Sequence, residues 1–216
     1  MAKRTYDKRI INNLAAGWSQ DGIWAARLGL ADEAARIVKE QARLKNSFRY
    51  GGWKSGDDIS WPEDDTLPAH ERLSTNPFLD AGGNSAFNLQ EMLLQSHQGI
   101  IRIIPAWPND WSGLFRLRAR NGFLIAAAIV NGNVPFVEIQ SIFGNSCAME
   151  NPWKGEQVIV RSDATRILKS QDETIHFETE KGKIYVIEPV KKSLTTWIAA
   201  DLNDKPNDRP GLPGRD

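Results

Sequence analysis

Two stretches in the first half of the sequence carry residue types that could perform acid–base chemistry or hold a polar ligand. The first is residues 51–86, a segment rich in Gly, Pro, Asp and Ser. Its carboxylates are Asp57, Asp58, Glu63, Asp64, Asp65, Glu71 and Asp80. Two carboxylates in different environments can divide the work of glycoside hydrolysis, one protonated as the acid and the other ionised as the base. The alternative interpretation is a solvated acidic loop, because exposed connections are normally polar.

The second stretch is Gly82-Gly83-Asn84, which stands just before a predicted amphipathic helix at 87–97. Glycines allow a backbone to approach a ligand closely, and the Asn84 amide can both donate and accept a hydrogen bond. The same residues also fit a plain helix N-terminus with Asn84 or Ser85 as the cap. The eight tryptophans, Trp61 of the acidic segment among them, either fill a large core or line a site that stacks on sugar rings.

The composition argues against several classes of function. Lys and Arg together number 27, as do Asp and Glu, so the 216-residue chain lacks the excess of positive charge that nucleic-acid binding needs. No apolar run is long enough to predict a membrane span, and the charged start lacks the apolar centre of a signal peptide. Cys147 is the single cysteine, and the three histidines have no metal-ligand spacing. We therefore expect no internal disulfide, no metal site and no cofactor.

The spacing of apolar residues changes near residue 100. Residues 7–28 show helical periodicity, Gly29 ends that helix, and a second helix follows it. A long loop at 51–86 and the helix at 87–97 then complete a helical part that we place at 1–98.

After this point short β-branched runs with a period of two predict strands, separated by turn signals such as Asn121-Gly122. The predicted strands are 99–105, 113–120, 122–130, 134–143, 156–162, 174–180 and 183–189. Their regular spacing indicates an antiparallel β-sandwich over 99–200, followed by a polar, Pro/Gly-rich loose tail at 201–216. The fold class predicted for the whole chain is α+β.

In the middle of the chain the sequence resembles the C-terminal part of glycoside hydrolase family 95, the α-L-fucosidase type, or a close relative of it. The resemblance lies in a Pro-Phe pair, a Gly-Asn turn, the run "EMLLQSH", a strand ending in "PAWP", a tryptophan and the run "LRARNGF". These are Pro77-Phe78, Gly83-Asn84, 91–97, 101–108, Trp111 and 117–123. The run "NSCAMENPW" at 145–153 also looks like a later sandwich strand of those relatives.

The resemblance implies the last helices of an (α/α)6 barrel followed by the terminal β-sandwich, because this chain is too short for the whole barrel of the family. It implies an inverting hydrolysis in which a Glu is the acid, an Asp is the base and paired Asn residues position the water. The Glu and the Asn pair lie upstream of what this chain contains, and Gly82 stands where the family has its base. That leaves Asp80 as the catalytic candidate. The residues that would bind substrate are Asn84, Gly82, Gly83, His70, Asp65 and Trp61.

Three functions follow from this comparison. In the first, the chain is the C-terminal fragment of a glycoside hydrolase that acts on glycans with α-linked deoxy-sugars and is incomplete for catalysis by itself. In the second, it is a non-catalytic carbohydrate-binding or accessory protein. In the third, it is a scaffold that associates with itself or completes a barrel with a separate helical chain. The full-length parent of the first function would be secreted or periplasmic.

Overall fold

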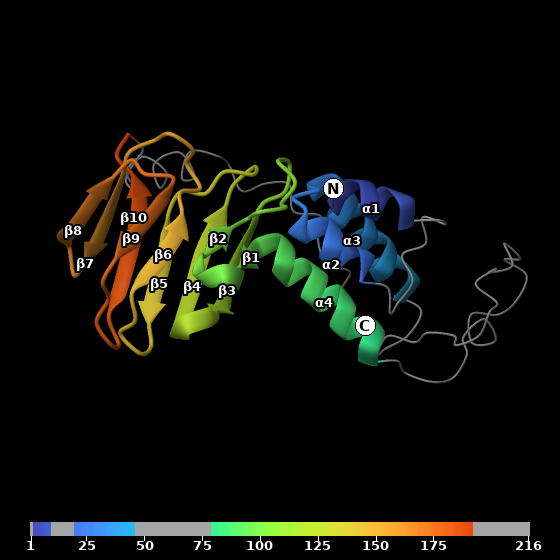
Figure 1. Ribbon diagram of the computed structural model, residues 1–216, viewed down its shortest axis with the longest axis horizontal. Helices are drawn as coiled ribbons and strands as arrows, with labels where there is room; N and C mark the ends of the chain where they lie inside the picture. Colours follow the sequence, from blue (N-terminus) through green and yellow to red (C-terminus); the bar gives the residue numbers. More distant parts are fainter. Residues whose placement is uncertain (1, 10–19, 46–78, 192–216) are drawn as a thin grey trace, which may run out of the picture.

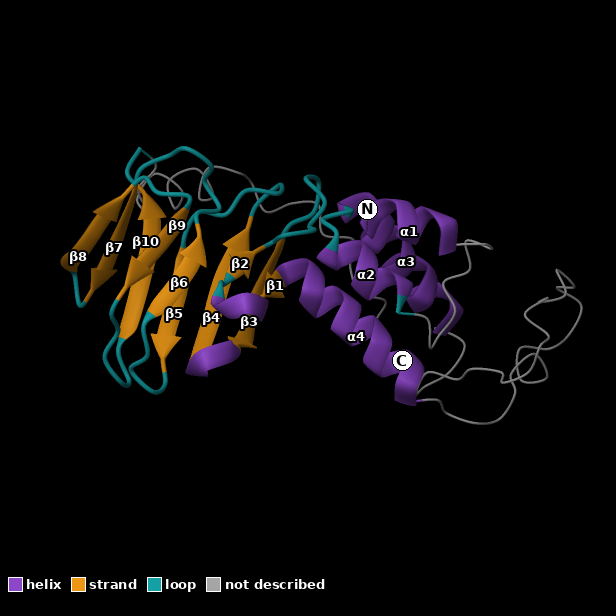
Figure 2. Cartoon of the chain, viewed as in Figure 1, coloured by secondary structure: helices purple, strands orange, loops and turns teal. Residues whose placement is uncertain are grey.

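The computed structural model describes residues 2–9, 20–45 and 79–191, and places the helices at one end of the molecule and the strands at the other (Figure 1). The strands are mostly antiparallel, and the predicted α+β class is confirmed (Figure 2). Three of the predicted site residues, all in the predicted loop at 51–86, fall outside this part of the chain. The residues concerned are Trp61, Asp65 and His70.

The helices of the described residues are α1 (Ala2–Arg9), α2 (Asp21–Arg27), α3 (Ala31–Lys45) and α4 (Leu79–Leu93). Helices α2 and α3 form a hairpin, and Gly29 ends α2 as predicted. Gly29 has a φ of 72°, and its N–H donates to the Ala26 carbonyl over 3.1 Å. The next N–H, that of Leu30, donates to the Ala25 carbonyl over 2.9 Å. A left-handed glycine thus satisfies the last carbonyls of the helix.

Small side chains allow these helices to pack closely. Ala25 and Ala26 of α2 and Ala34 and Ala35 of α3 are buried together with Met92 of α4. Because alanine adds only a methyl group, the helix axes can approach closely, and packing rather than helix propensity holds the short α2 in place.

Helix α4 begins and ends earlier than the sequence predicted. It runs from Leu79 to Leu93, so Gly82-Gly83-Asn84 is helical rather than a turn, and Asn84 does not cap a helix that starts at 87. Two helical glycines cost about 1 kcal/mol each relative to alanine. Packing of the buried side of α4 against α2 and α3 outweighs this cost. At the other end Leu94 and Gln95 leave the helix because they pair with a strand.

The strands are β1 (Leu94–Gln95), β2 (Arg102–Ile103), β3 (Gly113–Ala119), β4 (Phe123–Ile129), β5 (Val137–Ser141), β6 (Cys147–Glu150), β7 (Val158–Ser162), β8 (Thr165–Ser170), β9 (Thr174–Phe177) and β10 (Ile184–Pro189). Six of them form an antiparallel sheet in the order β3-β4-β5-β10-β7-β8. The pairs β1-β2 and β6-β9 are joined by a parallel bridge from Ile101 to Met149, so they make a second, smaller layer.

The core of the strand-rich part lies between these two layers. Ile125, Ile139 and Ile187 from the large sheet and Met149 and Ile175 from the small one are fully buried in one cluster. Strand β4 shows how the sequence directs this, because every second residue from Phe123 to Ile129 is buried. A strand with one face on the core and one face partly open gives the period of two that the sequence contains.

Candidate functional site

The predicted catalytic and sugar-binding residues that the structure covers all lie in α4. Asp80 and Gly82 are in its first turns. Gly83 is exposed, and a methyl group in place of its Hα would meet nothing within 4 Å. Asn84 is half-buried and lies about 100° further around the helix, so Gly83 and Asn84 face different sides. The glycine turn that was to carry a ligand is therefore replaced by a helix with two distinct faces.

The inner face of α4 is unusually polar for a buried surface. Asn88 and Glu91 of α4, and Gln95 in β1 just beyond its end, are 1%, 7% and 4% exposed. Gln95 Nε2 donates to the Ala26 carbonyl over 3.0 Å, and this hydrogen bond holds the residues after α4 against α2. Asn88 Nδ2 reaches the Ala34 carbonyl of α3 over 3.4 Å. The helices are thus joined by side-chain amides that meet backbone carbonyls.

Glu91 is paired with Arg27 at the end of α2. The guanidinium donates twice, from Nη2 to Oε1 over 2.9 Å and from Nε to Oε2 over 3.1 Å. Hydrogen bonding to Glu91 raises the pKa of Arg27, although burial lowers it in part. The same guanidinium carbon lies 5.7 Å from the ring centroid of Phe87. Arg27 therefore joins the polar inner face of α4 to an aromatic ring on its outer face.

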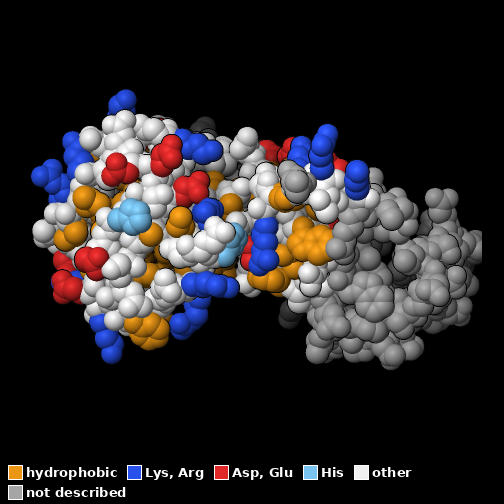
Figure 3. Space-filling view, viewed as in Figure 1, with side chains coloured by type: hydrophobic (Ala, Val, Ile, Leu, Met, Phe, Trp, Pro, Cys, Tyr) orange, Lys and Arg blue, Asp and Glu red, His pale blue; other side chains and the backbone are white. Residues whose placement is uncertain are grey.

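Between Gly83 and Gln90 the outer face of α4 carries no charged side chain. Gly83, Ala86, Phe87 and Gln90 are all exposed and follow one another at three- and four-residue steps, which places them on one stripe. We call these four residues the α4 outer stripe. Phe87 is 43% exposed and Leu89, beside the stripe, 36%. Exposed apolar side chains next to basic ones are visible over the helical part (Figure 3). A helix surface that faces water normally carries charged residues, so this stripe is typical of a surface that another element covers.

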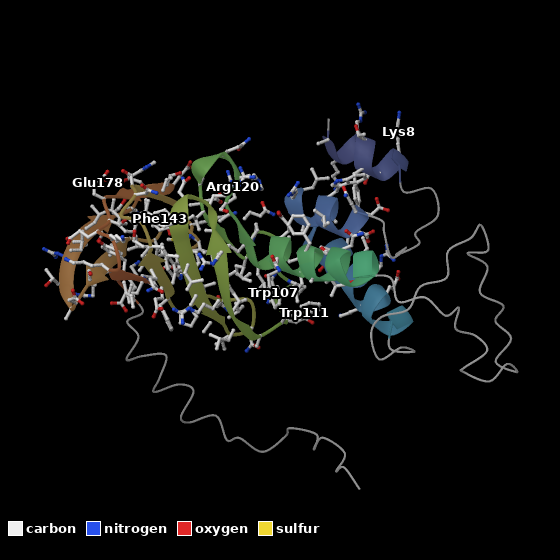
Figure 4. The ribbon with its side chains drawn as sticks, turned by 90° about the horizontal axis from the view of Figure 1, so that it is seen from below. Lys8, Trp107, Trp111, Arg120, Phe143 and Glu178 are labelled. Atoms are coloured by element: carbon white, nitrogen blue, oxygen red, sulfur yellow. The ribbon has the colours of Figure 1, made fainter. Side chains whose placement is uncertain are left out.

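Two tryptophans connect the helical part to the strands. Trp107 and Trp111 lie edge to face with ring centroids 5.2 Å apart, where the strand-rich part meets the helices (Figure 4). Trp107 Nε1 donates to the Trp111 carbonyl over 3.1 Å, and Lys39 Nζ of α3 lies 4.9 Å from the Trp111 centroid. Both rings pack on the helical core, so they act as a joint between the two parts.

The buried carboxylates of the described residues are both engaged by arginine. Glu91 is held by Arg27, and Glu188 of β10 accepts from Arg161 Nε over 3.1 Å. Neither is available as an acid or base for catalysis. Within residues 2–9, 20–45 and 79–191 no three His, Cys, Asp or Glu side chains lie close enough together to share a metal ion. No helix in these same ranges is long and apolar enough to cross a membrane.

Cys147 is packed rather than reactive, as the sequence indicated. Its side chain is buried in the strand core at 1% exposed, and burial raises the pKa of the thiol to about 12. The nucleophilic thiolate is therefore scarce near neutral pH.

The sequence analysis did not group Arg27, Phe87 and Glu91, because the ion pair between Arg27 and Glu91 joins residues far apart in the chain. The spacing of uncharged residues along 83–90 was a signal that could have indicated an outer stripe.

Comparison with known proteins identifies the strand-rich part. Residues 95–187 match the family model described as glycoside hydrolase family 95, C-terminal domain, so the resemblance seen in the sequence is confirmed over this region. No curated protein sequence matches the chain significantly.

Among solved structures, a GH127 β-L-arabinofuranosidase from Geobacillus stearothermophilus T6 is similar with a TM-score of 0.32 and 7% identity. The likeness covers 79% of this chain and 30% of that one, so this chain spans less than a third of the enzyme's length. A likeness at this level does not assign an activity.

Proposed function

We propose that this chain is the C-terminal part of an inverting glycoside hydrolase of the α-L-fucosidase type, and that it does not hydrolyse glycosides by itself. The observation that carries the proposal is the match of residues 95–187 to the C-terminal domain model of glycoside hydrolase family 95. The substrate class that follows is a glycan with an α-linked deoxy-sugar.

The uncharged outer stripe of α4 supports the barrel that this proposal requires. In an (α/α)6 barrel each helix packs against neighbouring helices, so a side that a neighbour covers is expected to be poor in charged residues. Helix α4 packs on α2 and α3 with one face and presents Gly83, Ala86, Phe87 and Gln90 on the other. We infer that this stripe meets helices supplied either by a longer form of the chain or by a separate helical chain.

The chemistry available to this chain alone is limited. Glu91 and Glu188, its buried carboxylates in the described ranges, are ion-paired, and Gly82 stands where the family has its base. The remaining catalytic candidate is Asp80, with Asn84, Gly83, Asp65, His70 and Trp61 as proposed sugar contacts. An acid on the opposite side of the glycosidic bond would have to come from elsewhere in the complete barrel.

The test is hydrolysis of 4-nitrophenyl α-L-fucoside by the isolated chain, followed by absorbance of the released nitrophenolate. We expect no turnover above the buffer rate. Turnover that disappears in the Asp80→Ala variant would overturn the proposal that the chain is incomplete.

A second function, a non-catalytic carbohydrate-binding protein, is favoured by one specific observation. The residue at the position of the family's base is Gly82, which has no side chain to act on a proton. A glycan array separates the two functions. Binding of fucosylated glycans by the isolated chain, without hydrolysis in any longer assembly, would support the accessory function.

A further inference from the structure

We propose that the edge strand β3 binds an acidic, extended peptide segment of a partner protein as an additional strand of the sheet. This inference is independent of the proposed glycosidase function. Strands β3 and β8 are the two outer strands of the six-stranded sheet. An outer strand can pair with another chain through its free backbone groups, and proteins normally protect such edges.

The two edges of this sheet differ in protection. Strand β8 pairs with β7 through a register shift between Val160 and Arg161, and such an irregularity twists an edge away from further pairing. Strand β3 pairs with β4 over seven residues, from Gly113 to Ala119, with no shift. A regular strand of this length presents the straight edge that strand addition needs.

The direction of the backbone groups of β3 follows from the neighbouring strands. The Ile142 N–H donates to the Gly122 carbonyl at the end of the β4–β5 pairing. Because bonding direction alternates along a strand, even-numbered residues of β4 bond to β5 and odd-numbered residues of β4 bond to β3. Phe115 and Leu117 of β3 lie opposite odd-numbered residues of β4, so their backbone groups are hydrogen-bonded to β4. The N–H and C=O groups of the even-numbered residues of β3 therefore point over the free edge. The Arg120 N–H agrees with this direction, because it donates to Ser96 Oγ over 3.0 Å. Ser96 directly follows β1, which contacts β3, so the unpaired part of the edge ends before Arg120.

The even-numbered side chains of β3 make this edge basic. Leu114 is 81% exposed, and Arg116 and Arg118 are exposed at successive alternate positions, about 7 Å apart. Arg120 is exposed just beyond them at the turn (Figure 4). Arg116 Nη2 donates to Gln140 Oε1 over 3.1 Å, whereas the guanidinium groups of Arg118 and Arg120 have no partner among the described residues. Strand β3 contains no acidic residue.

Charge complementarity selects the occupant. A second copy of β3 would bring four arginines, and no carboxylate, onto one two-stranded ribbon, which like-charge repulsion opposes. An acidic glycan could use the arginines but not the directed backbone groups. A peptide with acidic residues at alternate positions can pair with the arginines and also hydrogen-bond to the backbone of β3. It would place an apolar residue opposite Leu114 and carboxylates opposite Arg116 and Arg118.

The test is fluorescence polarisation of the full chain with the labelled peptide "TETETVT", whose antiparallel pairing places glutamates opposite Arg118 and Arg116. We expect saturable binding that weakens about fivefold or more in Arg116→Glu and in Arg118→Glu. Lys169→Glu, the matched reversal on the other edge strand, should bind as the parent chain does. The same peptide with both glutamates N-methylated keeps the charges but lacks the two N–H donors that face β3, and we expect it to bind at least about fivefold more weakly.

Backbone protection gives a second readout. In hydrogen exchange, the amides of Leu114, Arg116 and Arg118 should become protected when "TETETVT" is bound, because their N–H groups would then be hydrogen-bonded. The proposal is overturned by absence of binding, by equal binding of the two peptides, or by competition from oligogalacturonate as effective as that from the peptide. It is also overturned if sedimentation shows a dimer that Arg116→Glu strengthens and the peptide does not dissociate.

Discussion

Replacement of Gly22 by alanine should reveal how closely α2 and α4 are packed. A Cβ at position 22 would fall 2.6 Å from Asn88 Cγ and closer still to Asn88 Nδ2. Asn88 is 1% exposed, so its amide cannot swing into solvent to make room. Its Oδ1 has no hydrogen-bond partner, and its Nδ2 has only the long contact to the Ala34 carbonyl. The absence of a side chain at Gly22 therefore leaves room for the Asn88 side chain.

Two opposing effects set the size of the change. Alanine in place of a helical glycine stabilises a helix by about 1 kcal/mol. Overpacking a buried contact costs about 1–3 kcal/mol. With a separation of 2.6 Å we take the upper part of that range. We expect Gly22→Ala to lower the free energy of unfolding by about 1–2 kcal/mol, the difference between the two effects.

The assay is urea unfolding of single and double variants, followed by far-UV circular dichroism. In an Asn88→Ala background the obstacle is absent, so Gly22→Ala should raise the free energy of unfolding by about 1 kcal/mol instead. Gly83→Ala is the matched control in α4, because its new methyl group meets nothing within 4 Å. It should raise stability in either background.

The reasoning fails if Gly22→Ala has the same sign of effect in both backgrounds. Equal destabilisation would mean that the strain does not come from Asn88, and equal stabilisation would mean that the two helices lie further apart than described.

Three further predictions concern charge and the thiol. Arg27→Ala should lower the free energy of unfolding by about 1–2 kcal/mol in urea unfolding, because it leaves the buried Glu91 unpaired, although the exposure of Arg27 reduces the loss. Hydrogen bonding to Arg36 holds the pKa of Glu33 below its usual value, so the stability from this pair is present above about pH 4.5 and is lost as pH falls through the lower folded pKa. Glu33→Gln should remove that part of the acid dependence in a pH series of melting temperatures. Cys147, buried with a pKa of about 12, should react with Ellman's reagent at pH 8 only after unfolding, and rapid reaction of the native chain would contradict its packing.

The strands that the sequence predicted are those with one face on the core. Strand β4 alternates from Phe123 to Ile129, and β5 and β7 alternate in the same way. Strand β8 was missed because its position at the sheet edge leaves only Leu168 packed against the core, so its sequence shows no period of two. Strand β1 was missed because two residues are too few to show any pattern.

The candidate site was harder to predict than the fold, because its geometry depends on contacts between distant residues. The glycines at 82 and 83 indicated a turn by local propensity, and packing of α4 on α2 and α3 made them helical instead. The contact of Arg27 with Glu91 joins residues 64 positions apart, and no local pattern encodes it. The family resemblance, by contrast, depends on runs of residues in fixed order and was therefore visible in the sequence.

The most direct measurement of the central claim, that the α4 outer stripe is covered in the complete protein, is the reactivity of a cysteine placed at Ala86. Cys147 is buried, so an Ala86→Cys variant carries one reactive thiol among the described residues. In the isolated chain it should react with maleimide as fast as a Phe143→Cys control, because both positions are exposed. In a longer polypeptide or complex that supplies the remaining helices, its rate should fall about tenfold or more while that of the control is unchanged. Protection of position 86 already in the isolated chain, or equal reactivity in both forms, would contradict the account.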